Sequence, residues 1–227
     1  MRNQAVFFDL FETLITEFKN GIRKAPRSNH FVAQLGIDST LFEREWRSRQ
    51  EHRMNGTFPD FPSVLKDILN TLGHEVSEET IDNIHDERIA SKTIPFNGID
   101  PSILDMLGQL RSAGMKIGLV SNCTPEEVKA WEISALAPYF DDVIFSYAVN
   151  TAKPEPLIYQ LACKRLGVSP SESVFVGDGG SNELSGASSF GMTAYHAAWF
   201  LPEDRASKIT GYKKLRQPSE LVDLIRD

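Results

Sequence analysis

Five short runs of apolar residues recur along the chain, and they constrain the fold more than any other feature. The runs are AVFFDL, MKIGLVSN, DDVIFSYAV, ESVFVGD and TAYHAAWF. Their apolar residues are continuous rather than alternating with polar ones, which is typical of strands covered on both faces of a parallel sheet. From Pro95 onward the runs alternate with helical patterns. The sequence therefore predicts an α/β fold with an open, doubly wound, Rossmann-like parallel sheet.

Helix signals separate these strands. One helix is expected from about Pro101 to a stop at Gly114, and another from Thr124, with Pro125 at its first helical position. A third pattern, EPLIYQLACKRLG, ends at Gly167, and PSELVDLIR forms the last predicted helix. The predicted order of strands and helices places each connecting helix between two parallel strands.

The segment between the first and second runs has a different pattern. From Thr16 to about Thr93 its apolar spacing is helical, and it contains no strand-like run. One apolar stripe ends at Gly73, and Ser77 is an N-cap candidate for the next helix. We expect residues 16–95 to form an all-helical insertion, or cap, on a catalytic core made of residues 1–15 and 96–227.

Composition and charge narrow the class of protein. The 227 residues are 41% hydrophobic and 24% charged, as in ordinary soluble globular proteins, and the net charge of −7 argues against a nucleic-acid or anionic-lipid partner. No run approaches the ~20 apolar residues of a membrane helix. Only two cysteines occur, Cys123 and Cys163, which fits a reducing compartment and two buried thiols. We expect a soluble, cytoplasmic protein; the sequence does not specify its oligomeric state.

Polar residues stand at the ends of the predicted strands, where open α/β sheets bind their ligands. A carboxylate that attacks an anionic substrate needs a cation to offset repulsion, and two aspartates at this edge offer oxygen ligands for Mg²⁺. A lysine and a hydroxyl there can hold the charge that develops during transfer. The residues concerned are Asp9, Ser121, Asn122, Lys153, Asp178 and Glu183.

Each of these residues also has an ordinary structural interpretation. Asp9 can cap a turn, Ser121 and Asn122 can cap the helix that opens at Pro125, and Lys153 alone would be a surface lysine in most proteins. Glu183 can favour a helix N-terminus. Independent structural roles would scatter along the chain, whereas these residues gather at one edge of one predicted sheet, which favours a shared function.

The motifs resemble those of the haloacid dehalogenase superfamily of aspartate-nucleophile hydrolases. FFDLFETL, GLVSN, AKPEP and VFVGDGGSNEL stand in the order of the superfamily's four motifs, with a helical cap between the first and second. The resemblance covers essentially the whole chain, and it is specific because four motifs coincide. It implies an enzyme that acts on a small anionic molecule.

Site roles follow from the resemblance residue by residue. It implies that Asp9 is the nucleophile that forms an aspartyl-enzyme intermediate. Ser121 would bind a substrate oxygen with Asn122 as support, and Lys153 would bridge the nucleophile and the substrate.

The resemblance also implies a magnesium site. Asp9 and Asp178 would be ligands, and the backbone carbonyl of Phe11 would be a further one. Glu183 stands where many relatives have a second acid, which binds the metal through water or orients Lys153.

Phe11 departs from the phosphatase pattern. Many phosphatases of this superfamily have an acid there, which protonates the leaving group. The metal-free 2-haloacid dehalogenases have an aromatic residue at this place, so Phe11 favours that alternative. Asp178 favours a metal-dependent phosphatase instead, because an extra carboxylate beside Asp9 is repulsive without a cation. We expect a phosphatase, with a dehalogenase and a noncatalytic protein of the same fold as alternatives.

Glu12 follows Phe11 in the same turn. It is either a substitute acid or a turn-stabilising residue.

Two basic segments lie in the predicted cap. Phe42, Trp46, Arg49 and Arg53 share one helical face, so Arg49 and Arg53 either bind a second anionic group of the substrate or cover the edge of the cap's packing with their stems. The segment from Lys19 to Arg27 either lines the cap entrance or forms a solvated loop. The sequence does not identify the substrate.

Overall fold

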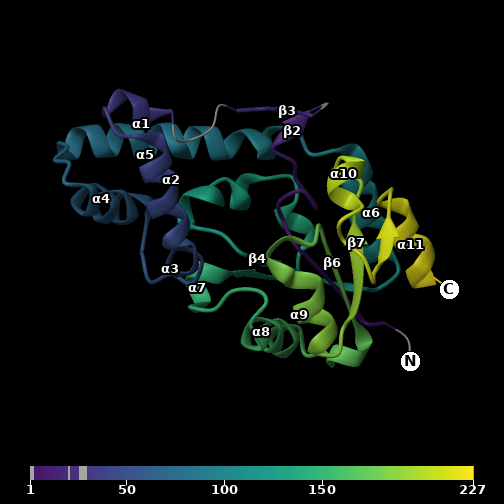
Figure 1. Cartoon of the computed structure of the whole chain (residues 1–227). Helices are drawn as coiled ribbons and strands as arrows, with labels where there is room; N and C mark the ends of the chain where they lie inside the picture. The colour runs from purple at the N-terminus through teal and green to yellow at the C-terminus, as the bar shows by residue number, and fades with distance from the viewer. Residues whose placement is uncertain (1–2, 20, 26–29, 227) are drawn as a thin grey trace.

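A six-stranded parallel sheet forms the centre of the molecule (Figure 1). The structure is a computed structural model that describes residues 3–19, 21–25 and 30–226. The strand order is β5-β4-β1-β6-β7-β8, so β1 lies between β4 and β6. This confirms the predicted α/β fold. The strands are β1 (Ala5–Phe8), β4 (Lys116–Ser121), β5 (Asp142–Phe145), β6 (Ser173–Gly177), β7 (Thr193–Ala197) and β8 (Lys213–Leu215).

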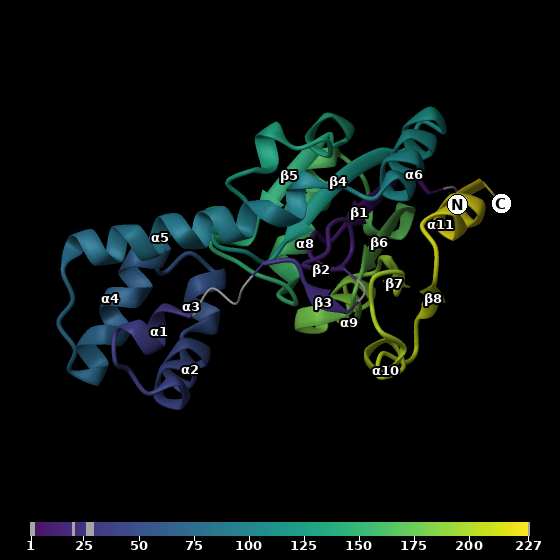
Figure 2. The ribbon, with the colours of Figure 1, turned by 90° about the horizontal axis from the view of Figure 1, so that it is seen from above.

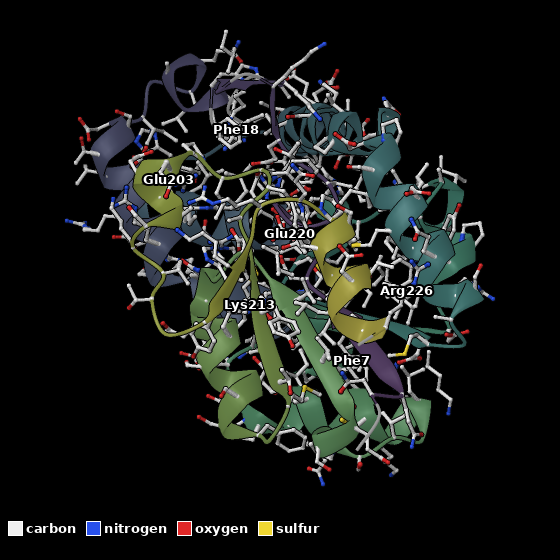
Figure 3. The ribbon with its side chains drawn as sticks, turned by 90° about the vertical axis from the view of Figure 1, so that its right-hand side faces the viewer. Phe7, Phe18, Glu203, Lys213, Glu220 and Arg226 are labelled. Carbon is white, nitrogen blue, oxygen red and sulfur yellow. The ribbon has the colours of Figure 1, made fainter. Side chains whose placement is uncertain are left out.

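Alternate residues of β1 pack into two different cores, because successive side chains of a strand point to opposite faces. Val6 and Phe8 contact the core under α6 (Pro101–Ser112) and α11 (Ser219–Arg226), whereas Ala5 and Phe7 contact the core under α8 (Pro156–Leu166) and α9 (Glu183–Ser189). Figure 3 shows α11 beside α6, where Arg226 Nη2 donates a 3.0 Å hydrogen bond to Gln109 Oε1. Both faces of the sheet are therefore covered, as continuous apolar strands require. The remaining short elements of the core are α7 (Ser146–Val149), α10 (Glu203–Ala206), η1 (Ile94–Asn97), η5 (Pro170–Glu172) and η6 (Gly180–Asn182).

Most predicted helices form where their end signals place them. The Asp100 side chain caps α6 by accepting from the backbone N–H of Ser102, and α8 ends at Gly167, which has a positive φ of 61°. Both cysteines are buried and free, as predicted. None of the helices in the described part of the chain combines the length and apolar character needed to cross a membrane.

The helix expected from Thr124 does not form. Three short 3₁₀ turns replace it: η2 (Pro125–Glu127), η3 (Trp131–Ile133) and η4 (Ala137–Tyr139). The buried anchors Val128 and Trp131 are three residues apart, which matches the three residues per turn of a 3₁₀ helix.

The cap lies beside the carboxyl edge of the sheet (Figure 2). It has its own apolar core, which includes Phe31, Phe42, Phe61, Leu65 and Ile68. The expectation of an all-helical cap was wrong in one place, because the cap also contains a small antiparallel hairpin of β2 and β3 near its first connection. Gly21, with a φ of 76°, supplies the turn conformation that such a hairpin needs. The cap elements are β2 (Phe18–Lys19), β3 (Ile22–Arg23), α1 (Phe31–Gln34), α2 (Ser39–Ser48), α3 (Gln50–Met54), α4 (Phe61–Leu72) and α5 (Glu78–Thr93).

Buried ion pairs join the cap to the core. Arg88 of α5 donates to Glu126 Oε1 at 2.7 Å and to Glu127 Oε1 at 3.2 Å in η2. Lys92, one turn further along α5, lies 3.1 Å from Glu127 Oε1 and 3.0 Å from Glu17 Oε1. Removing one partner of such a cluster leaves a buried charge uncompensated. We call these five residues the cap–core ion cluster.

The cluster predicts how stability depends on pH. Burial alone would raise the pKa of the Glu127 carboxyl, but the charges of Lys92 and Arg88 outweigh it and hold the pKa at about 2, below the ordinary 4.5. Its contribution is therefore present above pH ~4.5 and is lost as the pH falls toward 2. We expect Glu127→Gln to lower the free energy of unfolding at pH 7 by about 3 to 5 kcal/mol, measured by denaturant titration.

The same variant should also have a flatter stability profile between pH ~4.5 and 2 than the wild type. Glu132→Gln, at an exposed position of η3, is the matched control and should follow the wild-type profile. Equal acid sensitivity of the Glu127→Gln variant and the wild type would contradict this account of the cluster.

Candidate active site

The parallel sheet brings the predicted polar residues to one edge. Asp9 directly follows β1, Ser121 ends β4 and Asp178 directly follows β6, and these three strands are adjacent in the sheet. Lys153 comes from the loop before α8, and Glu183 is the first residue of α9. Their side chains therefore converge at the carboxyl ends of the strands.

Asp9 is held on both sides of its carboxylate. Its backbone N–H donates to the carbonyl of Val176 at 2.9 Å, which ties the residue to the end of β6. Lys153 Nζ lies 2.5 Å from Asp9 Oδ1, and Thr13 Oγ1 donates to Asp9 Oδ2 at 3.3 Å. The carboxylate is thus fixed in place at the mouth of the sheet.

Lys153 forms a buried bridge between two carboxylates. Its ammonium lies 2.5 Å from Asp9 Oδ1 and 2.5 Å from Glu183 Oε2. Burial alone would lower the pKa of Lys153, but the charges of Asp9 and Glu183 outweigh it and raise the pKa above its ordinary value. The lysine is therefore a fixed cation rather than a proton donor at neutral pH.

Asn122 clamps the loop that carries this lysine. Its Nδ2 donates to the Lys153 carbonyl at 2.8 Å, and its Oδ1 accepts from the Lys153 backbone N–H at 2.8 Å. Both halves of the amide are engaged with the backbone. The structure therefore places Asn122 behind the lysine as a positioning residue, and its predicted contact with substrate stays a prediction.

Glu183 is fixed by three contacts with neighbouring elements. Besides Lys153, its Oε1 accepts from the backbone N–H of Gly179 at 3.1 Å, and its own carbonyl accepts from Tyr159 Oη at 2.8 Å. The carboxylate lies directly against Gly177, where there is no room for a Cβ. A glycine at the end of β6 is thus what admits Glu183 to the site.

The charges of the site fit a divalent cation. Asp9, Asp178 and Glu183 each offer one oxygen, and these oxygens lie within 4.8 Å of one another. Burial, and next the charge of Asp9, raise the pKa of both Asp178 and Glu183. Three carboxylates face one ammonium, so a bound Mg²⁺ would offset the remaining negative charge with the oxygen ligands it prefers. The predicted role of the Phe11 carbonyl stays a prediction.

Ser121 presents a polar group with no partner. It is fully buried, and its Oγ makes no hydrogen bond to any described residue. Buried hydroxyls are almost always hydrogen-bonded in folded proteins. A free hydroxyl beside Asp9 and Lys153 fits a group that is completed by a substrate oxygen.

Comparison with protein families agrees with this arrangement. The model of the haloacid dehalogenase-like hydrolases matches residues 4–191. The chain belongs to this family. Its fold, a six-stranded parallel sheet with a helical insert region, is therefore that of a haloacid dehalogenase-like hydrolase.

Individual relatives carry two different activities. A glyceraldehyde 3-phosphate phosphatase of Methanopyrus kandleri is 26% identical over 234 residues, covering 99% of this chain and 97% of the relative. An (S)-2-haloacid dehalogenase of Burkholderia cepacia is 28% identical over 195 residues, covering 83% and 80%. The crystal structure of a haloacid dehalogenase family enzyme from Bacteroides thetaiotaomicron, in complex with magnesium and inorganic phosphate, superimposes with a TM-score of 0.61 at 21% identity, covering 86% of this chain and 94% of that one.

In this hydrolase, the turn after Asp9 is stabilised by Glu12. Its φ is 55°, its Oε2 accepts from Thr16 Oγ1 at 2.7 Å, and its Oε1 accepts from the Glu17 backbone N–H at 2.8 Å. Both carboxylate oxygens are therefore engaged within the turn. This supports the turn-stabilising interpretation over a substitute acid.

The two cap arginines have different positions. The predicted helical face is interrupted because α2 ends at Ser48, and the Arg49 guanidinium pairs with Glu45 at 2.8 Å and with Asp67 of α4 at 2.6 Å. Arg49 is thus held by carboxylates within the cap, whereas Phe42, Trp46 and Arg53 of the predicted face line the cavity between cap and core. Arg53 is buried, with its guanidinium 3.8 Å from the centroid of the Trp46 ring.

Several residues of this region have no sequence motif of their own. The cap–core ion cluster, Gly177 and Tyr159 all act through tertiary contacts. The basic segment from Lys19 to Arg27 contributes Arg23 to a cavity between cap and core, while residues 20, 26 and 27 lie outside the described residues. The contact between Thr13 and Asp9 could have been predicted from the sequence, because the two residues are only four positions apart.

Gly177 gives a direct test of the site's packing. An alanine there would put its Cβ into the Glu183 carboxylate, and we expect a loss of about 1 to 3 kcal/mol in the free energy of unfolding, as for other overpacked cores. Gly108→Ala on α6 is the matched control, because its Cβ would have only Tyr139 Cε1 at 3.9 Å as a neighbour. That variant should be neutral or more stable by up to ~1 kcal/mol, since alanine favours helices. Equal stability of both variants by denaturant titration would contradict the predicted close contact.

Proposed function

We propose that this hydrolase is a Mg²⁺-dependent phosphatase that acts on a small phosphorylated metabolite through an aspartyl-phosphate intermediate on Asp9. The observation that carries the proposal is the grouping of Asp9, Asp178 and Glu183 around a single lysine. A nucleophile that only displaces halide needs no such set of oxygen ligands. An enzyme that brings a phosphate dianion against a carboxylate does need a cation there.

The side chains have complementary tasks in this reaction. A carboxylate oxygen of Asp9 attacks phosphorus as the P–O bond to the substrate alcohol breaks, and water then hydrolyses the acyl phosphate to release inorganic phosphate and restore Asp9. Lys153 and the free hydroxyl of Ser121 bind phosphoryl oxygens while charge develops on them. Mg²⁺, when bound, supplies further charge neutralisation. Phe11 has no proton to give, so the substrate either has a good leaving group or receives its proton from the cap, from metal-bound water or from another group of the substrate itself.

The relatives support the reaction class and leave the substrate open. The phosphatase of Methanopyrus kandleri aligns over 99% of this chain, including the cap. The enzyme of Bacteroides thetaiotaomicron, with the same fold, is described in complex with magnesium and inorganic phosphate. Both point to phosphoryl chemistry at a site of this architecture.

Dehalogenation is the second candidate, and one observation favours it. Phe11 puts an aromatic ring two residues after Asp9, and an (S)-2-haloacid dehalogenase is among the relatives. In that reaction an Asp9 oxygen would attack carbon as the carbon–halogen bond breaks, and water would hydrolyse the resulting ester. No metal is required, which separates the two candidates experimentally.

A panel of phosphate monoesters and 2-haloacids, assayed with Mg²⁺ or with EDTA, tests the proposal. We expect Mg²⁺-dependent release of phosphate and no release of halide. Asp9→Asn and Asp178→Asn should each lower the rate by roughly 10³-fold or more, as losses of nucleophiles and their partners do. Asp223→Asn, an exposed carboxylate of α11, is the matched control and should keep wild-type turnover.

Two results would contradict this assignment. Release of halide that is insensitive to EDTA, without release of phosphate, would identify a dehalogenase. Turnover that survives Asp9→Asn unchanged would exclude Asp9 as the nucleophile.

A further inference from the structure

We infer that the cavity between cap and core is an anion subsite in which Arg53 binds a carboxylate of the substrate, so that the enzyme prefers phosphate monoesters that carry a carboxylate. This inference rests on the proposed phosphatase function and adds the class of substrate. It concerns a cavity of about 350 Å³ whose lining includes Trp46 of α2, Arg53 of α3 and Glu127 of η2.

The cavity lies close to the catalytic edge of the sheet. Lys92, one of its lining residues, has its ammonium 5.7 Å from the centroid of the Phe11 ring, two residues after the nucleophile. Glu127, another, belongs to the loop that follows Ser121. The cavity is therefore next to the segments that follow β1 and β4, the strands that lead to Asp9 and Ser121.

Charge makes the cavity suitable for an anion. Among the described residues, three acidic side chains line the cavity, Glu17, Glu43 and Glu127, and five cationic side chains line it. This local positive excess occurs in a protein whose net charge is −7. The cationic residues are Arg23, Arg47, Arg53, Arg88 and Lys92.

Arg53 differs from its neighbours because no carboxylate in the described part of the chain pairs with it. Arg88 and Lys92 belong to the cap–core ion cluster, and Arg47 pairs with Glu43 at 2.7 Å. Arg53 is only 6% exposed, its Nε has no partner among the described residues, and its Nη2 makes one long bond of 3.4 Å to the Trp46 carbonyl. Burying a charged group without hydrogen-bond partners is costly, so an anionic ligand would satisfy it.

The surroundings of Arg53 favour a carboxylate in particular. Its guanidinium stacks on Trp46, which in turn stacks on Phe42 at a centroid distance of 6.1 Å. The aromatic rings orient the guanidinium plane and limit its hydration, and a planar guanidinium matches a carboxylate through two parallel hydrogen bonds. The charges of Glu127 and Glu126 act on Arg53, but these acids already pair within the cap–core ion cluster, so a substrate carboxylate would supply the direct contact.

A matched pair of substrates tests the inference: 3-phosphoglycerate, which carries a carboxylate, and glycerol 3-phosphate, which has a hydroxymethyl group in its place. We expect the wild type to have the lower KM for 3-phosphoglycerate. Arg53→Met should raise that KM by roughly 10- to 100-fold, the range of a charge-assisted pair, and leave both kinetic constants for glycerol 3-phosphate within about 3-fold. Arg44→Met, an exposed arginine of α2, is the matched control and should change neither substrate.

A binding measurement separates this inference from the proposed function. In the Asp9→Asn background, 3-phosphoglycerate is titrated while tryptophan fluorescence is followed, because Trp46 contacts Arg53. Binding that weakens roughly 10-fold or more on adding Arg53→Met supports the subsite even if no phosphate monoester is hydrolysed.

Arg53→Lys keeps a positive charge and provides a second variant should Arg53→Met fail to fold. Its lost second hydrogen bond should still raise the KM for 3-phosphoglycerate selectively. Equal effects of the Arg53 substitutions on both substrates, or no effect on either substrate and on binding, would overturn the inference.

Discussion

The pairing of Lys153 with Asp9 and Glu183 is the interaction on which the rest of the site depends. A buried ammonium 2.5 Å from each of two carboxylates allows both acids to be present at the end of a hydrophobic strand. Without it, the buried carboxylates of Asp9 and Glu183 would have no ammonium between them. The lysine therefore offsets part of the negative charge that Asp9, Asp178 and Glu183 bring to this edge of the sheet.

This pairing also explains the residues that hold Lys153 and Glu183 in place. Asn122 holds the backbone of Lys153 through two hydrogen bonds of 2.8 Å, and Gly177 leaves space for Glu183. Both residues act by positioning, because a shift of either one would move the ammonium relative to its two carboxylates. The placement of the Lys153 ammonium therefore determines how the neighbouring residues of the site are arranged.

The sequence predicted the parts of the structure that depend on local pattern. Continuous apolar runs identified the buried strands, and the residue after each run identified the catalytic edge, because parallel strands bring their carboxyl ends together. Features set by tertiary contacts were not predictable in this way. The break of the cap helix at Arg49, which lets its guanidinium reach Asp67, and the pairing of Arg88 with Glu126 across 38 positions of sequence have no periodic signal. The 3₁₀ turns after Thr124 arise because core packing overrides a local helix-start signal.

The two halves of the molecule have opposite electrostatic character at the point where they meet. The core edge offers three carboxylates around Lys153, whereas the cavity under the cap has an excess of cations. The cap–core ion cluster neutralises part of that excess and fixes α5 against η2. Arg53 is a buried cation that pairs with no carboxylate among the described residues. A substrate with a phosphate at one end and a carboxylate at the other would meet a metal-assisted nucleophile and a guanidinium in turn. Specificity in such an arrangement comes from the separation of the two charges in the substrate, since a molecule with only one of them satisfies only one half of the site.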